Sequence, residues 1–347
     1  MNPISPPFER TELDVRIWRD ELDEFVPRRV FDVHTHVYRW SFNLDLHKDA
    51  SPYRALLGTH LLESTWERLD DADALLMPGR EVHRLAFPFP FPHPCDFEAS
   101  NRFLAIEVAR DPASAGLMLV HPGMSAEQVE ADVGRYGFVG FKPYRWYATS
   151  GDAVDAGITE FMPEHQLAVA DRRGLIVMMH LSRRDAIGDP RNVDDLLRLC
   201  GAYPGVRWIL AHCARSYSAW AIESAARRLR GLPNVWYDVS SVCESDAIDA
   251  LFTGVGADRV MYGSDDLPVG VLRGKYVSFG RAWAYLSETN HAMSLAHCDG
   301  RMTFTRYEQL RAMKRAAMRL GMTTPQREAL FHGTARDLVA RAADWPS

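Results

Sequence analysis

Short apolar runs, each followed by an amphipathic helical stretch, recur along most of this 347-residue chain. Runs of this length that are rich in Val, Ile and Phe are typical of strands buried on both faces of a parallel sheet. Strict alternation of strands and helices predicts an α/β fold. The expected strands are Val30–His34, Ala74–Met77, Leu117–Val120, Phe138–Phe141, Leu175–His180, Val206–His212, Val235–Val239 and Val260–Gly263. The expected helices include Ser125–Arg135, Glu160–Arg173, Val193–Tyr203, Ser216–Leu229 and Ser245–Phe252.

Eight such units favour a closed barrel over an open, doubly wound sheet. The open sheet would normally carry a glycine-rich phosphate loop after an early strand, and the sequence has none. We therefore predict a single (β/α)8 TIM barrel over residues 29–347. Residues 1–28 are expected to be a short N-terminal extension that contains a helix across one barrel end.

Three long segments are expected as loop insertions at the C-terminal face of the barrel. Residues 37–71 follow the first strand, and residues 80–101 contain Pro88, Pro90, Pro92 and Pro94, which favour an extended loop. Residues 267–325 after the last strand are far longer than one connection requires. Long loops at a barrel mouth often close over substrates.

Composition excludes several classes of function. The net charge of -6 does not suggest the basic face that a nucleic-acid partner requires. The chain has neither an apolar run of the roughly 20 residues that span a bilayer nor the layout of a signal peptide. Its 5 dispersed cysteines, without a CxxC pair, indicate reduced thiols in a cytoplasmic protein. We expect a small-molecule substrate and no nucleic-acid or membrane partner, and a homo-oligomer stays open.

Polar residues close several of the expected strands, and the carboxyl ends of barrel strands meet at one face. Because residues two apart on a strand share a face, Asp32, His34 and His36 are expected on the same side. His180, His212 and Asp265 end three further strands. Four imidazoles and one carboxylate would converge, a donor set that suits one divalent metal ion: zinc, with manganese or iron as alternatives.

Five motifs, in this order, resemble the amidohydrolase superfamily and, more narrowly, its amidohydrolase-2 group of hydrolases, lactonases and non-oxidative decarboxylases. They are DVHTH at 32–36, GFKPY at 140–144, MMHLS at 178–182, LAHCAR at 210–215 and YGSDDLP at 262–268. The resemblance covers about residues 29–340. It implies that His34, His36, His180 and Asp265 hold the metal, and that His212 acts as acid/base or polarises the substrate. Asp266 competes with Asp265, but only one can face inward, and the resemblance favours Asp265.

Further residues at the strand ends are candidates for substrate binding. Lys142 either contacts a substrate anion, which we favour, or is carbamylated to bridge two metal ions as in other branches of the superfamily. Arginine suits carboxylate recognition through its planar fork. The other candidates are Tyr144, Arg145, Arg183, Arg215 and His121.

The resemblance implies hydrolysis of an amide, another C–N bond or a lactone by metal-activated water, with His212 and Asp265 as catalytic residues. Non-oxidative decarboxylation of an unsaturated or aromatic acid would use the same ligands and is the main alternative. A non-catalytic metal-binding barrel is the second alternative.

Overall fold

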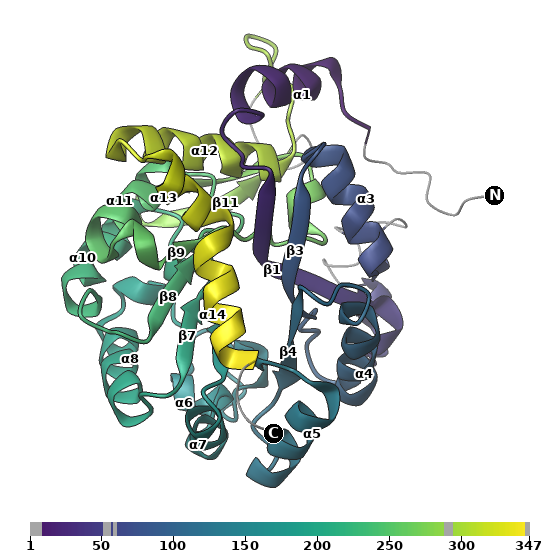
Figure 1. Ribbon diagram of the computed structural model, residues 1–347, viewed down its shortest axis with the longest axis vertical. Helices are drawn as coiled ribbons and strands as arrows, with labels where there is room; N and C mark the ends of the chain where they lie inside the picture. Colours follow the sequence, from purple (N-terminus) through teal and green to yellow (C-terminus); the bar gives the residue numbers. More distant parts are fainter. Residues whose placement is uncertain (1–8, 51–56, 58–60, 288–293, 344–347) are drawn as a thin grey trace.

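The eight barrel strands close into a ring in the computed structural model, which describes residues 9–50, 57, 61–287 and 294–343 (Figure 1). Their order is β1-β3-β4-β5-β6-β7-β8-β9, with every neighbouring pair parallel. The ring closes where Thr35 bridges to Asp266 and the backbone N–H of Val33 donates to the carbonyl of Tyr262 at 3.1 Å. The strands are β1 (Arg29–Arg39), β3 (Glu81–Pro88), β4 (Ala115–Val120), β5 (Gly140–Pro143), β6 (Ile176–Met179), β7 (Arg207–Leu210), β8 (Val235–Asp238) and β9 (Val260–Met261).

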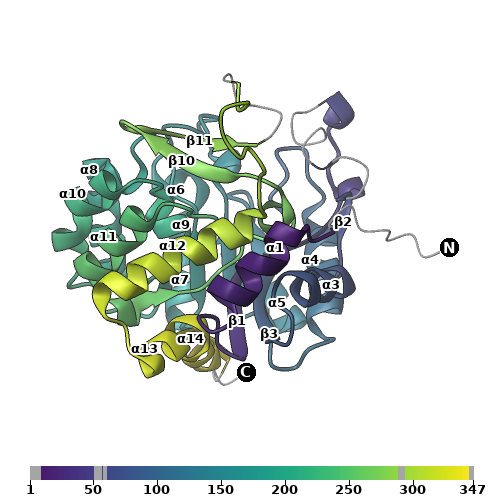
Figure 2. The same cartoon turned by 90° about the horizontal axis from the view of Figure 1, so that it is seen from above.

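Helices follow the strands and surround the barrel, so the predicted (β/α)8 TIM barrel is confirmed (Figures 1 and 2). They are α3 (Trp66–Leu76), α4 (Phe97–Val108), α5 (Ala126–Tyr136), α6 (Ile158–Phe161), α7 (Glu164–Arg172), α8 (Pro190–Ala202), α10 (Ala219–Leu229), α11 (Ser245–Val255), α12 (Thr305–Leu320) and α13 (Thr324–Glu328). The last helix, α14 (Thr334–Ala343), packs Leu338 and Val339 onto an apolar cluster inside the barrel that includes Phe31 and Val33. It therefore covers the amino-terminal end of the barrel, and the opposite end is left for a site.

The N-terminal helix lies elsewhere than expected. Helix α1 (Glu12–Ile17) continues into a π-helical turn, and both pack beside α12 rather than across a barrel end (Figure 2). The ring of Trp18 stacks on that of Tyr307 with centroids 6.2 Å apart, and Arg311 donates to Glu21 at 2.8 Å. The expected position was wrong, because the residues after α1 find their partners on α12, in the helix layer, and not on a barrel end.

The second barrel strand was also misplaced. Residues 74–77 end helix α3, and the strand is β3, inside the segment expected to be a loop. Charged residues hid its apolar character. Arg84 of β3 is 1% exposed because its guanidinium pairs with Asp70, at 2.9 Å, and Asp73 of α3. Pro88 is the last residue of β3, so the proline-rich segment begins only where the strand ends.

Two shorter elements extend the carboxyl-terminal side of the barrel. The two-residue strand β2 (Glu63–Ser64) pairs antiparallel with the end of β1. After β9, strands β10 (Lys275–Phe279) and β11 (Ala282–Leu286) form an antiparallel hairpin, which lies at the top of Figure 2. The predicted insertion at 267–325 therefore contains this hairpin and α12.

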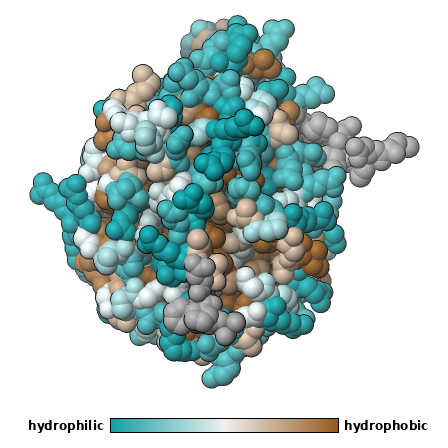
Figure 3. All heavy atoms as spheres, in the orientation of Figure 1, coloured by the Kyte–Doolittle hydropathy of each residue, from teal (hydrophilic) through white to brown (hydrophobic). Residues whose placement is uncertain are grey.

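The protein surface seen in Figure 3 is mainly polar. Hydrophilic residues cover most of the face in Figure 3, with small hydrophobic patches between them. Among the described helices, none combines the length and the apolar character that crossing a membrane requires. All 5 cysteines are free thiols, four of them buried.

Candidate metal centre and substrate pocket

A bulge in β1 turns its histidines toward the site. The pairing of β1 with β3 shifts register between Asp32 and Thr35. Asp32 pairs with Arg84, whose side chain reaches helix α3, so Asp32 faces the helix layer. His34 and His36, after the shift, both line a cavity at the carboxyl end of the barrel. The expectation that Asp32 shares their face was wrong, because a bulge breaks the two-residue alternation of a strand.

Asp238, at the end of β8, orients His34. Its Oδ2 lies 2.9 Å from Nδ1 of His34, and its Oδ1 accepts from the backbone N–H groups of His212 and Ser240 at 2.9 and 3.0 Å. Burial lowers the pKa of His34 to about 3, so the imidazole is neutral. With Nδ1 donating to Asp238, the lone pair of Nε2 is free for a metal ion, the usual role of a carboxylate behind a metal-binding histidine.

Asp265 lies against both histidines of β1. Its Oδ1 is 3.4 Å from Nε2 of His34 and 3.3 Å from Nε2 of His36. Burial by itself would raise the pKa of Asp265, but His212, the hydrogen bond to His36 and the nearby His34 outweigh it and hold the pKa low. The neighbouring Asp266 instead pairs with Arg306 of α12. Asp265 is therefore the ionised carboxylate at the cavity, and Asp266 anchors the chain to the helix layer.

His212 sits on an unusual turn after β7. The four residues His212 to Arg215 all adopt left-handed conformations, with φ of 58°, 51°, 58° and 56°. Such conformations cost about 1–2 kcal/mol per residue and persist where the surroundings enforce them. Nδ1 of His212 lies 3.0 Å from the carbonyl of Ser240, which it can reach only as a donor, so Nε2 is left for chemistry.

His180 follows β6 beside His212, with ring centroids 5.3 Å apart. Burial lowers the pKa values of His180 and of His36. The Nδ1 atoms of both rings are buried and lack a hydrogen-bond partner within the described parts of the chain. Neutral imidazoles with unpartnered nitrogens beside an ionised carboxylate are the donor set that a divalent metal ion requires.

The tightest group that could hold a metal ion differs from the predicted ligand set. One ligand atom each from His34, His212 and Asp265 lies within 4.8 Å of the others. His36 adjoins this group through Asp265, and His180 adjoins it through His212. The donor chemistry fits a divalent ion, and His212 belongs to this group whereas His36 and His180 do not.

The cavity above this cluster has a volume of about 190 Å³. Of the predicted substrate-binding residues, Tyr144, Arg145 and Arg215 line it. Among the described residues that line it, Asp265 is the sole carboxylate. Burial and the charge of Arg145 lower the pKa of Arg215 to about 10, so the guanidinium of Arg215 stays charged at neutral pH. A cavity lined by two arginines and one carboxylate favours an anionic ligand.

Lys142 lies beneath the cavity and does not line it. Its Nζ is fully buried, 4.4 Å from the centroid of the Phe87 ring, with no hydrogen-bond partner among the described residues. Burial lowers the pKa of Lys142 to about 8, although Asp238 and Asp265 partly offset this. In this arrangement Lys142 does not reach the ligand space.

Two other predicted substrate contacts lie outside the cavity lining. Arg183 is buried against α8, where it donates to Asn192 at 3.1 Å and lies 3.6 Å from Asp195. The ring of His121 packs on that of Phe97, with centroids 4.5 Å apart. Arg183 and His121 thus each hold a loop against a helix.

Sequence reasoning missed two groups of residues at the site. Asp238 ends a strand, as the predicted ligands do, and that position was a usable signal. Tyr217, Tyr276 and Trp283 also line the cavity. Tyr276 and Trp283 come from the hairpin inside the long insertion, where no local pattern indicated strands.

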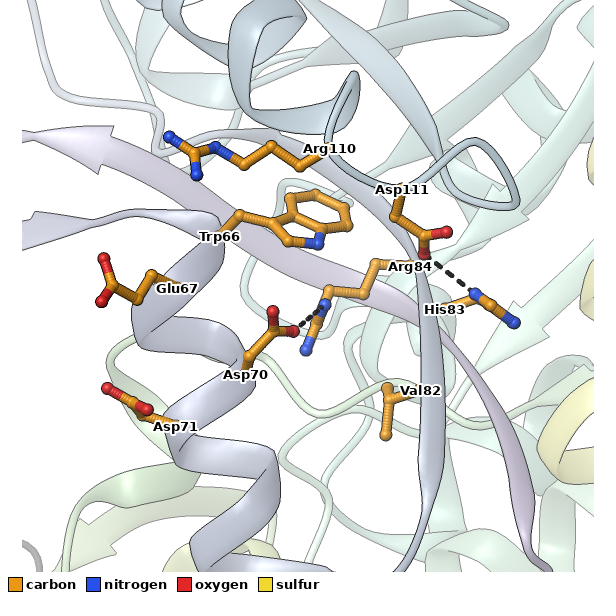
Figure 4. A pocket seen from close by; sticks show the side chains of 9 residues that line it. All are labelled: Trp66, Glu67, Asp70, Asp71, Val82, His83, Arg84, Arg110 and Asp111. Carbon is orange, nitrogen blue, oxygen red and sulfur yellow. Dashed lines mark hydrogen bonds and ion pairs between the residues drawn. The ribbon is translucent and has the colours of Figure 1, made fainter.

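A larger cavity, about 690 Å³, opens outside the barrel between α3 and β3 (Figure 4). Its charged residues are partly paired: Arg84 with Asp70, and His83 with Asp111, each at 2.9 Å. None of the predicted site residues lines it. The larger cavity therefore does not coincide with the candidate metal centre, which is formed by the buried imidazoles and Asp265.

A closed α/β barrel with imidazoles and a carboxylate at the carboxyl ends of its strands defines the class of metal-ligating barrel enzymes. The family model described as amidohydrolase matches residues 31–341, and the chain belongs to this family. No curated protein matches the sequence significantly.

Solved structures share the fold. An amidohydrolase from Burkholderia multivorans is 18% identical, with a TM-score of 0.58 over 91% of this chain and 99% of that one. A 5-carboxyvanillate decarboxylase from Sphingomonas paucimobilis is 14% identical, with a TM-score of 0.58 over 90% and 99%. A proposed 2-pyrone-4,6-dicarboxylic acid hydrolase from Pseudomonas putida is 19% identical, with a TM-score of 0.55 over 91% and 98%.

Proposed function

We propose that this protein is a metal-dependent hydrolase that cleaves an amide, another C–N bond or a lactone in a small, carboxylate-bearing substrate. The observation that carries the proposal is the group of His34, His212 and Asp265, buried together at the base of a 190 Å³ cavity. His36 and His180 complete the donor set. The ion we expect is zinc, with manganese or iron as alternatives, because neutral imidazoles and a carboxylate suit all three.

Different residues of the chain bind the metal ion and transfer the proton in the proposed hydrolysis. When bound, a divalent ion supplies Lewis acidity and makes water nucleophilic near neutral pH. Asp265 and the imidazoles of His34, His36 and His180 would hold it. His212 has its Nδ1 occupied by Ser240, so its Nε2 is the atom that accepts a proton from water and returns it to the leaving group.

The substrate is held by charge and by flat surfaces. Arg145 and Arg215 offer two guanidiniums to a carboxylate, and such pairing is strong when it is shielded from water. Arg215 is already positioned, because it donates to the carbonyl of Leu181 at 3.1 Å. Aromatic residues around the cavity exclude water from the reacting bond.

Decarboxylation of an unsaturated or aromatic acid is the second candidate. The two guanidiniums in the cavity support it as well. They can bind an acid whose carboxylate is the reacting group as readily as an acid whose carboxylate only anchors the substrate. Two of the structural neighbours carry names that refer to carboxylated rings, 5-carboxyvanillate and 2-pyrone-4,6-dicarboxylic acid.

One panel of substrates separates the two reactions. Protein of measured metal content is incubated with lactones, amides and hydroxybenzoates, and acid release and CO₂ are followed on the same samples. Hydrolysis that disappears with chelator and in Asp265→Asn supports the proposal. Release of CO₂ from a hydroxybenzoate, with every lactone and amide left intact, would overturn it in favour of decarboxylation.

A further inference from the structure

The hairpin of β10 and β11 delivers two aromatic side chains to the cavity. Tyr276 and Trp283 both meet Tyr217, with ring centroids 4.7 and 4.3 Å away, and lie 5.7 Å from each other. These spacings are those of packed aromatic pairs. The three rings, called the aromatic wall below, form one continuous surface, and all three line the cavity.

The aromatic wall stands directly beside the proposed acid/base. The ring of Tyr217 stacks on that of His212 with centroids 6.2 Å apart and planes 22° apart. The hydroxyl of Tyr217 also lies 3.2 Å from that of Ser241, which is 3.3 Å from Nδ1 of His212. A group that touches the wall is therefore next to the reacting end of the cavity.

Contacts on both strands and at the turn hold the hairpin in place. The hydroxyl of Tyr285 lies 2.9 Å from that of Thr305, at the start of α12. The backbone N–H of Ser278 donates to Glu244 at 3.2 Å. At the turn, the guanidinium of Arg281 lies 4.5 Å from the centroid of the Trp220 ring. Held at three places, the hairpin is a fixed wall of the cavity.

We propose that the aromatic wall sets the size limit of the substrate, with Trp283 as the specificity-determining residue that admits one flat ring and excludes two fused rings. This rests on the proposed function, in that the ligand is taken to be a small carboxylate. The cavity, about 190 Å³, is smaller than the roughly 300–1,000 Å³ of drug-sized pockets. The wall offers a face for a ring to pack against, and the contacts of the hairpin hold that face in place.

Binding of two acids that differ by one ring tests the proposal. Dissociation constants of benzoate and 2-naphthoate are measured by calorimetry on metal-loaded wild type, Trp283→Ala, Trp283→Phe and Phe279→Ala. Phe279 is the matched control, because it is on the same hairpin, 58% exposed, and does not line the cavity. Wild type should prefer benzoate. Trp283→Ala should shift the ratio of the two constants toward 2-naphthoate by about tenfold or more, the scale at which apolar pockets discriminate by size.

The variants give distinct outcomes. Trp283→Phe should shift the ratio less than Trp283→Ala, because it keeps a flat ring; it also serves if the alanine variant disrupts the hairpin. An unchanged ratio in both Trp283 variants overturns the proposal, as does an equal shift in Phe279→Ala. Wild type that binds neither acid overturns it as well. Selective binding with no turnover of any substrate would sink the proposed function alone and leave the size limit intact.

Discussion

The carboxylate of Asp238 contacts both His34 and His212, through different oxygens. Oδ2 lies 2.9 Å from Nδ1 of His34, and Oδ1 accepts from the backbone N–H of His212 at 2.9 Å. Asp238 is fully buried. One side chain thus fixes the ring of the first histidine and the backbone of the second, which are two of the three members of the tight cluster.

Replacing Asp238 with asparagine should weaken metal binding by about 10–100-fold, the usual cost of losing such a supporting carboxylate. An amide can accept from one neighbour but presents an N–H₂ to the other, so His34 loses its fixed orientation. Competition with a chromogenic chelator measures the affinity. Asp246→Asn, an exposed carboxylate on α11, is the control. Equal affinities in the two variants would mean that Asp238 does not orient the ligands.

Purified protein should contain about one divalent metal ion per chain, because the described part of the chain holds a single group of suitable ligands, with one cavity-facing carboxylate. Elemental analysis gives the content, and dialysis against chelator should remove activity that zinc, manganese or iron restores. Full turnover in chelator by metal-free protein would contradict this prediction.

Most of the fold was predictable because its strands are apolar runs that end in polar residues, as at His180 and His212. The exceptions have physical causes. Strand β3 carries Arg84, whose charge is hidden by acidic partners on α3 that no local pattern connects to it. The direction of Asp32 depends on a bulge, which alternation alone does not foresee.

The candidate site was predictable to a similar degree. Strand ends brought the four histidines and Asp265 to one face, but sequence cannot tell how near each side chain comes to a common centre. That distance depends on the left-handed turn after β7, which moves His212 into the tight cluster. Lys142, although it ends a strand segment of the same kind, does not line the cavity, and its Nζ lies 4.4 Å from the centroid of the Phe87 ring.

Metal-free protein should lose stability as the pH falls from about 6.5 toward 3. Burial lowers the pKa of His34 to about 3, whereas an unfolded histidine titrates near 6.5. Within that window the unfolded chain binds more protons than the folded one, so acid favours unfolding. Thermal unfolding in chelator at pH 7.5, 6 and 5 measures the slope. His34→Gln should give a shallower slope, and identical slopes would show that His34 does not contribute.

Replacing Arg306 with methionine should both destabilise the fold and weaken metal binding. Arg306 is 1% exposed and pairs with Asp73 and with Asp266, the neighbour of Asp265. Asp265 has a left-handed φ of 65°, which this anchored neighbour helps to hold. Removing one partner of a buried pair costs about 3–5 kcal/mol. Denaturant unfolding measures the loss.

The absorption spectrum of the cobalt-loaded protein distinguishes a role of Arg306 in positioning the metal ligands from a role in stability alone. Loaded with cobalt, Arg306→Met should show an altered visible spectrum, and Arg306→Lys should restore part of it. Arg311→Met, on the same helix but paired with Glu21, should lower stability slightly and leave the spectrum unchanged. A destabilised Arg306→Met with a wild-type spectrum would limit the role of Arg306 to folding.

His212→Asn should retain the metal ion and lower kcat by at least about two orders of magnitude, because general acid–base catalysis typically supplies about 10²–10⁴ in rate. Asparagine can still donate to the carbonyl of Ser240, so the turn after β7 should persist, but it has no nitrogen that accepts a proton. KM should change less than kcat, because the proton moves mainly in the transition state. Metal content and kinetics are measured on the same preparation.

The position of His212 in the tight cluster makes the metal content of this variant decisive. If His212→Asn loses its ion while His180→Ala keeps it, His212 is a ligand and His180 takes the outer role. If both variants lose the ion, both are ligands, and another group must move the proton. If His212→Asn keeps both its ion and full kcat, His212 is a bystander. Loss of kcat with the ion retained is the result expected of an acid/base whose Nδ1 is held by Ser240 and whose Nε2 is left to accept the proton.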